Sequence, residues 1–226
     1  MIASGDIRYV GFASDVPAVL AGGGDLDDAL IHVGVATEGS WATLGSSMYP
    51  FLATDIDGYG AWDLESVVYR FYGDQDSFWA ATFSVSGENS AGELVWDELV
   101  DIYPVNWGTD AEVAVFDNNQ VVIPLSPGWA GIPEGSTPTF RVQTYSPYDV
   151  DDNIIDEVTF TADPFTPNYV FDGAWALGTH VLGSAGDEIT VHRTEKTPAE
   201  GKLLLLHAAN ATGSRAQVVD VTATLP

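Results

Sequence analysis

The sequence predicts an all-β fold, an antiparallel β-sandwich of the immunoglobulin-like or jelly-roll-like kind with little helix. Short runs rich in Val, Ile, Phe, Tyr and Trp recur along the chain, which is the composition that strands favour. Gly, Asn, Asp and Pro separate these runs at intervals of roughly 8–12 residues, the spacing of a sandwich. No long window places apolar residues at i, i+3, i+4 and i+7 between helix caps, so little helix is expected.

The strand-like segments follow one another along the whole chain. A glycine-rich stretch at 21–25 leads into the second of them, and residues 93–103 are the nearest helix candidate, although their apolar positions fit either period poorly. The expected strands are residues 7–12, 29–36, 66–71, 78–85, 111–116, 120–125, 139–145, 157–161, 174–177, 188–193, 202–208 and 216–223.

The chain is expected to form one domain, a single β-sandwich over residues 1–226. Residues 124–138 hold four prolines around Trp129 and indicate an ordered loop rather than a linker. A weaker alternative places a boundary at 163–167, in the sequence Asp-Pro-Phe-Thr-Pro. The segment after that point holds too few strands to fold alone, so the single domain is preferred.

The charge balance excludes several partners. The chain carries 33 acidic against 7 basic residues, a net charge of -26, and this field repels nucleic acid and anionic membrane surfaces. The longest apolar run, Leu203 to Leu206, is too short to insert into a bilayer. The acidic, lysine-poor composition favours an extracellular or cell-surface location, and any export signal is expected upstream of this chain, because Met1 to Asp6 lack signal character.

The densest group of candidate ligands lies in the sequence Asp-Ile-Asp-Gly-Tyr-Gly-Ala-Trp-Asp at 55–63. Hard cations need several oxygen ligands that converge from a tight turn. In a calcium-loop numbering that starts at Asp55, Asp57 takes position three, the carbonyl of Ala61 position seven and Asp63 position nine. Glu65 is a further acidic candidate, so calcium is the expected cofactor, held by these residues.

Two departures from the calcium-loop pattern keep a second interpretation open. Tyr59 occupies position five, and Ser66 occupies position twelve because Glu65 falls one residue early. The flanks are strand-like rather than helical. The alternative is a solvated acidic β-turn, in which Asp and Gly are favoured for backbone reasons alone.

No catalytic motif is present, so the chain is expected not to be an enzyme. There are no cysteines, the four histidines form no metal-binding pair, and no serine lies in a nucleophile elbow. A glycosidase needs a pair of carboxylates, but 33 acidic residues offer many pairs, so this signal has almost no value.

The seven tryptophans favour a carbohydrate-binding module as the first rival, because exposed aromatic rings bind sugars. Trp107 and Trp129 lie in turn-rich stretches and are the best candidates for exposure. Most of the seven are nevertheless expected to pack in the sandwich core.

The order of several motifs resembles a known region of secreted proteins. The turn at 55–58 precedes the strand Val67-Val68-Tyr69, and Phe-Asp-Asn-Asn-Gln-Val-Val-Ile-Pro-Leu follows at 116–125. The chain closes on an apolar strand at 201–207 and the pattern Asn-x-x-Gly-x-Arg-Ala-x-Val-Val at 210–219. From about residue 31 to 221 this is similar to the β-rich accessory region that follows the catalytic domain of secreted bacterial subtilisin-like serine peptidases.

The resemblance implies an accessory role and transfers no catalytic residue, because the peptidase motifs are absent and one Asp of the usual acidic turn is missing. We therefore expect a non-catalytic extracellular accessory or surface-interaction module that calcium stabilises. Its expected partner is a protein or a cell-surface polymer. The rivals are the carbohydrate-binding module and a self-assembling cell-surface or filament subunit that associates through exposed sheet edges.

Overall fold

The computed structural model describes residues 3–70, 77–106, 116–149, 153–171, 191–194, 197–198, 200–207 and 215–222. They form mostly antiparallel strands, which confirms the predicted all-β, sandwich-like fold. The elements are β1 (Ile7–Ser14), α1 (Val16–Ala21), η1 (Leu26–Asp28), β2 (Ile31–Thr43), β3 (Tyr49–Asp55), β4 (Leu64–Tyr69), β5 (Trp79–Glu88), β6 (Leu94–Pro104), β7 (Phe116–Leu125), β8 (Thr139–Tyr145), β9 (Ile154–Thr161), β10 (Tyr169–Phe171), β11 (Val191–Arg193), β12 (Glu200–Leu206) and β13 (Ala216–Thr222).

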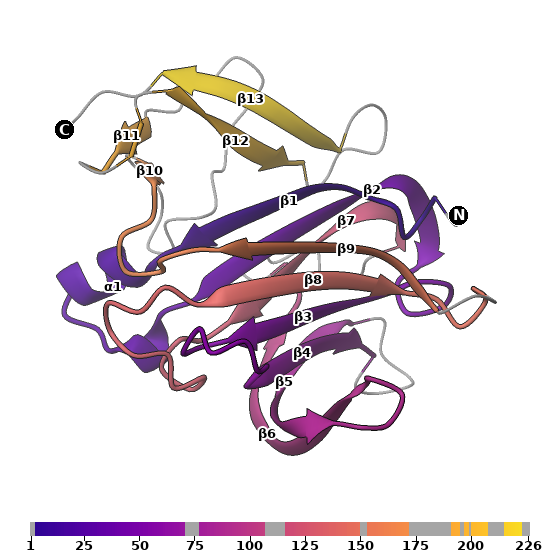
Figure 1. Cartoon of the computed structure of the whole chain (residues 1–226). Coiled ribbons are helices and arrows are strands. Elements are labelled where there is room, and N and C mark those ends of the chain that lie inside the picture. Colours follow the sequence, from indigo (N-terminus) through magenta and orange to yellow (C-terminus); the bar gives the residue numbers. More distant parts are fainter. Residues whose placement is uncertain are drawn as a thin grey trace.

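Two sheets form the sandwich. One has three strands in the order β1-β2-β7, and the other has six in the order β6-β5-β4-β3-β8-β9 (Figure 1). All described strand pairs are antiparallel. The remaining strands form two ribbons, β10-β11 and β12-β13. Because β3 lies between β4 and β8, the six-stranded sheet joins chain segments that are far apart in sequence.

The core lies between the two sheets and follows the alternation of side chains along each strand. Even-numbered residues of the six-stranded sheet face inward, among them Leu52, Val68 and Phe140, and they belong to one buried cluster with residues of β2 and β7. Trp41 is completely buried in this cluster. The expectation that most tryptophans pack in the core is not met among the five that the structure describes, because Trp62 and Trp79 are half-buried and Trp96 and Trp129 are exposed. Odd-numbered residues of β3, β4, β5 and β8 therefore point to its outer face, whereas the register shifts between β5 and β6 bring the even-numbered Trp96 to that face.

The ribbon β12-β13 covers the outer face of the three-stranded sheet. A Cβ atom at Gly11 would lie 2.8 Å from Leu204 Cδ2, and one at Gly34 would lie 2.8 Å from Leu206 Cδ1. These two glycines thus leave the space into which the leucines of β12 pack. Figure 1 shows the ribbon beside β1, on the side of the molecule away from β3 to β6.

Several segments differ from the sequence-based expectation. The helix candidate at 93–103 lies almost entirely in strand β6, and β3, β10 and the short helix α1 were not predicted. Pro50 argues against a strand at the position of β3, because proline is normally confined to edge strands. In the structure β3 is nevertheless central and pairs with both β4 and β8. The predicted strand at 174–177 and most of the one at 111–116 lie outside the described residues. No helix among the described residues is long and apolar enough to cross a membrane.

Candidate metal centre and the outer face of the six-stranded sheet

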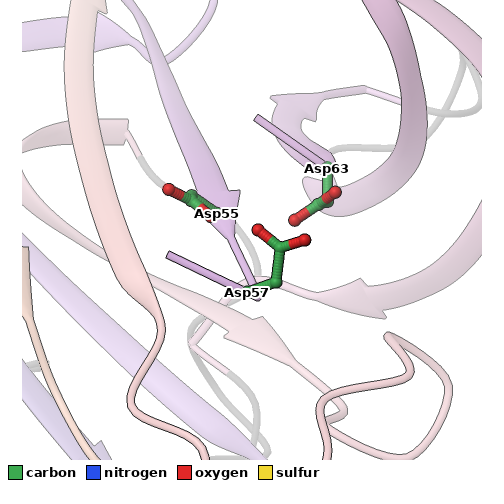
Figure 2. A group of neighbouring side chains, drawn as sticks. All are labelled: Asp55, Asp57 and Asp63. Atoms are coloured by element: carbon green, nitrogen blue, oxygen red, sulfur yellow. The ribbon is translucent and has the colours of Figure 1, made fainter. Parts of the chain in front are cut away.

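The acidic turn between β3 and β4 brings three carboxylates together. Asp55 ends β3 and is buried, Asp57 is exposed at the turn, and Asp63 immediately precedes β4. One ligand oxygen from each of the three lies within 4.8 Å of the others. Figure 2 shows Asp57 between the other two, with its carboxylate directed toward that of Asp63. The sequence prediction of a carboxylate group in this turn therefore has a spatial basis.

Asp55 organises the turn by accepting two backbone hydrogen bonds. The amide of Gly58 donates to Oδ1 at 2.7 Å, and the amide of Gly60 donates to Oδ2 at 2.8 Å. Both glycines have positive φ, 76° and 85°, in the region that disfavours other residues. The glycines thus let the chain fold around a buried carboxylate, which is the turn chemistry of the acidic-turn interpretation.

Asp57 and Asp63 each accept one backbone hydrogen bond. The amide of Tyr59 donates to Asp57 Oδ1 at 3.0 Å, and the amide of Ile56 donates to Asp63 Oδ2 at 2.7 Å. The carbonyl of Asp63 also accepts from the amide of Val85 at 2.8 Å, which ties the turn to β5. A carboxylate oxygen that accepts one hydrogen bond still has a lone pair, so the turn geometry is compatible with cation ligation.

The other two predicted ligands are placed differently. Ala61 is exposed in the turn, where its carbonyl belongs to the same loop. Glu65 is buried on β4, and its Oε2 accepts a hydrogen bond of 2.6 Å from Trp96 Nε1. It is not among the three converging carboxylates. Two residues beyond Asp63, the strand has begun, and its alternation directs Glu65 toward the outer face of the sheet.

Burial determines the electrostatics of Glu65. Desolvation raises the pKa of its carboxyl group, while the hydrogen bond from Trp96 and the positive charge of Arg141 oppose that rise. The guanidinium of Arg141 in turn lies 4.4 Å from the ring centroid of Trp62, in cation–π geometry. Glu65, Arg141 and the two tryptophans therefore form one connected group.

This connected group is part of an aromatic outer face that the sequence analysis missed. An antiparallel sheet that faces water on one side normally alternates apolar and polar residues, with the polar ones outward. Here seven aromatic residues occupy outward positions on five strands. Those aromatic residues are Tyr49, Phe51, Tyr69, Trp79, Phe83, Trp96 and Tyr145. Six of these residues are odd-numbered, and register shifts bring Trp96 of β6 to the same face, but without β3 and the strand order the sequence could not assign them to one face.

Trp129, the exposed tryptophan that the sequence singled out, lies in the loop between β7 and β8 and is not part of the aromatic outer face. Its exposed fraction is 58%, which confirms the expectation of exposure. It borders a shallow hollow along residues 99–103 of the edge strand β6. Trp107, the other predicted exposed ring, lies outside the described residues.

Comparisons with known proteins identify no relative. No family model, no curated protein and no solved structure matches this chain. The resemblance to the peptidase-associated region therefore stays a prediction, and functional reasoning depends on the acidic turn and on the outer face.

Proposed function

We propose that this chain is a non-catalytic, extracellular β-sandwich binding module that calcium stabilises at Asp55, Asp57 and Asp63. The observation that carries the metal site is the convergence of three carboxylate oxygens within 4.8 Å of one another. Three like charges at that separation repel one another, and a divalent cation would convert the repulsion into attraction. The lack of a catalytic motif in the sequence supports the non-catalytic role.

Calcium is favoured over softer metals by the chemistry of the ligands. Carboxylate and carbonyl oxygens suit hard cations, and the turn offers three carboxylates together with the nearby carbonyl of Ala61. An ion that binds only the folded state stabilises it by RT ln(1 + [L]/Kd), about 2.7 kcal/mol at a hundredfold excess over Kd. A bound ion would thus hold the turn between β3 and β4, which contains Trp62.

Thermal unfolding tests the metal site. We expect millimolar calcium to raise the melting temperature beyond the increase that sodium chloride gives at the same ionic strength, because salt only screens the net charge of -26. Asp57→Asn should remove most of the calcium-specific increase. Asp97→Asn removes one charge from an exposed position on β6 and is the matched control. Equal responses to both salts, or an unchanged calcium response in Asp57→Asn, would show that the turn binds no ion.

Carbohydrate binding is the second candidate, and it is favoured by Trp96, whose ring is 45% exposed and is held by Phe83 and Glu65. Self-assembly through an open edge is less well supported. The edge strand β6 carries Asp97, Glu98 and Asp101, and its pairing with β5 shows repeated register shifts. Charges and bulges on an edge are the devices that prevent edge-to-edge pairing.

A further inference from the structure

The outer face of the six-stranded sheet combines aromatic rings with a row of fixed polar groups. Arg141 on β8 pairs with Ala53 on β3, Ala53 with Glu65 on β4, and Glu65 with Phe83 on β5. These residues therefore form one line across the sheet. Ala53 is almost completely buried, so the larger side chains around it close over the floor of the face.

Trp96 stands at one end of this row and is held on two sides. Its ring stacks on Phe83 with 5.0 Å between centroids and 11° between planes. Its Nε1 donates to Glu65 Oε2 at 2.6 Å. The residue is nevertheless 45% exposed. A desolvated carboxylate is thus used to fix an exposed ring, and core stability alone does not require that arrangement.

Trp62 stands near the other end, above Arg141. The Nε atom of Arg141 lies 4.0 Å from Glu157 Oε2, and the same Glu157 oxygen accepts a hydrogen bond of 2.6 Å from Gln143 Nε2. Planar donors and acceptors are therefore fixed beside the ring. A small number of positioned polar groups among aromatic side chains is the pattern of a ligand-binding surface.

We propose that this outer face binds a neutral polysaccharide chain, with Trp62 and Trp96 as the two stacking platforms. The proposal rests on the proposed function of a binding module and names its ligand. A sugar ring offers an apolar C–H face to an aromatic ring and hydroxyl groups at its edge. The carboxylates of Glu65 and Glu157 can accept hydrogen bonds from those hydroxyls, and Arg141 and Gln143 can donate to their oxygens.

The negative charge of the chain favours a neutral glycan over other ligands that could bind an aromatic face. The net charge of -26 repels anionic polysaccharides and a second copy of the chain alike. A protein strand added at β6 would meet the acids and register shifts of that edge. A neutral chain that lies across the strands needs neither the edge nor a countercharge.

Affinity electrophoresis in native gels tests the proposal on the intact chain. The gels contain hydroxyethyl cellulose, mixed-linkage β-glucan, glucomannan or soluble starch, and alginate serves as the anionic counterpart. We expect retardation by at least one neutral polymer and none by alginate. Trp62→Ala and Trp96→Ala should each weaken that binding at least about tenfold, the effect typical of a central aromatic contact.

Trp129→Ala is the matched control, because Trp129 is exposed but lies in the loop between β7 and β8. The affinity of this variant for the polymer should stay within about twofold of that of the parent chain. Loss of binding in Trp129→Ala with Trp96→Ala unaffected would overturn the assignment to this face. Absence of retardation in all neutral gels, or capture of a basic peptide instead, would overturn the glycan ligand. If Trp62→Ala or Trp96→Ala does not fold, acrylamide quenching of the Trp129→Ala variant is measured with and without the retarding polymer. Protection by the polymer in the absence of Trp129 supports the assignment to this face, and a lack of protection overturns it.

The melting-temperature response to calcium is measured on the same samples. A chain that responds to calcium and binds no polysaccharide would refute the glycan proposal and leave the metal site intact. A chain that binds polysaccharide and does not respond to calcium would refute the metal site alone.

Discussion

The two sheets of this sandwich differ in how their outer faces are built. The three-stranded sheet presents Gly11 and Gly34, and the chain's own ribbon fills that space with Leu204 and Leu206. The six-stranded sheet presents aromatic rings that polar side chains hold in place, as Glu65 holds Trp96. Glycines adapt a face to a fixed internal partner, whereas rigid, partly exposed rings suit a partner from outside. The comparison assigns a structural role to one face and a binding role to the other.

The buried carboxylate of Asp15, beside the three-stranded sheet, gives the largest expected effect. Asp15, directly after β1, accepts a hydrogen bond of 2.6 Å from the amide of Leu30, but desolvation raises its pKa from 3.8 to about 6. One pKa unit corresponds to about 1.4 kcal/mol. Because the folded state binds this proton more tightly, stability should fall by about 3 kcal/mol in total as the pH rises from well below 3.8 to well above about 6.

The measurement compares the free energy of unfolding of the parent chain with that of Asp15→Asn across this pH range. The difference should shift against the parent chain as the pH rises, because only the parent chain carries the carboxyl group that must ionise. Asp97→Asn, at an exposed position, is the control and should give a nearly constant difference. Parallel curves for the parent chain and Asp15→Asn would contradict the raised pKa.

Gly11→Val tests the covered face. The added side chain would meet Leu204, whose Cδ2 and Cβ lie 2.8 Å and 3.1 Å from the Cβ position. Overpacking of this kind typically costs about 1–3 kcal/mol in the free energy of unfolding. Chemical denaturation measures the loss, and Leu204→Ala in the same chain should recover part of it. Strictly additive effects of the two substitutions would mean that β12 does not cover Gly11.

Glu65→Gln tests the open face and should have a smaller effect. Burial raises the pKa of Glu65, so ionisation lowers stability as the pH rises above the ordinary pKa of 4.5. The pH-dependent loss should be weaker than that of Asp15, because Trp96 and Arg141 partly offset the desolvation. The parent chain should lose stability relative to Glu65→Gln as the pH rises, and the tryptophan emission should titrate only in the parent chain. A pH-independent difference would refute the role of Glu65.

Thr159→Val gives the smallest effect. Thr159 pairs with Arg141 at the edge strand β9 and is exposed on the outer face. A substitution of an exposed side chain usually changes stability by less than about 0.5 kcal/mol. Denaturation curves of the variant and the parent chain should therefore nearly coincide. A loss as large as that of Gly11→Val would show that the outer face is covered like the other one.

The sequence by itself determined those features that depend on neighbouring residues. Strand composition and turn residues predicted the all-β fold. The strand predicted at 139–145 has the same bounds as the observed β8. The acidic turn at Asp55, Asp57 and Asp63 was recognisable because its three ligands lie within one short segment, and a turn of that length brings its own side chains together. Local patterns contain this information because strand and turn formation depend on adjacent residues.

Only the tertiary structure decided how distant side chains combine. The bond from Trp96 to Glu65 spans 31 residues, and the contact of Trp62 with Arg141 exists because β3 pairs with both β4 and β8. Sequence reasoning grouped Glu65 with the metal ligands because it follows Asp63 so closely, yet strand alternation directs it toward Trp96. Which rings share a face depends on strand order and register, and these are fixed by packing between segments that no local pattern connects.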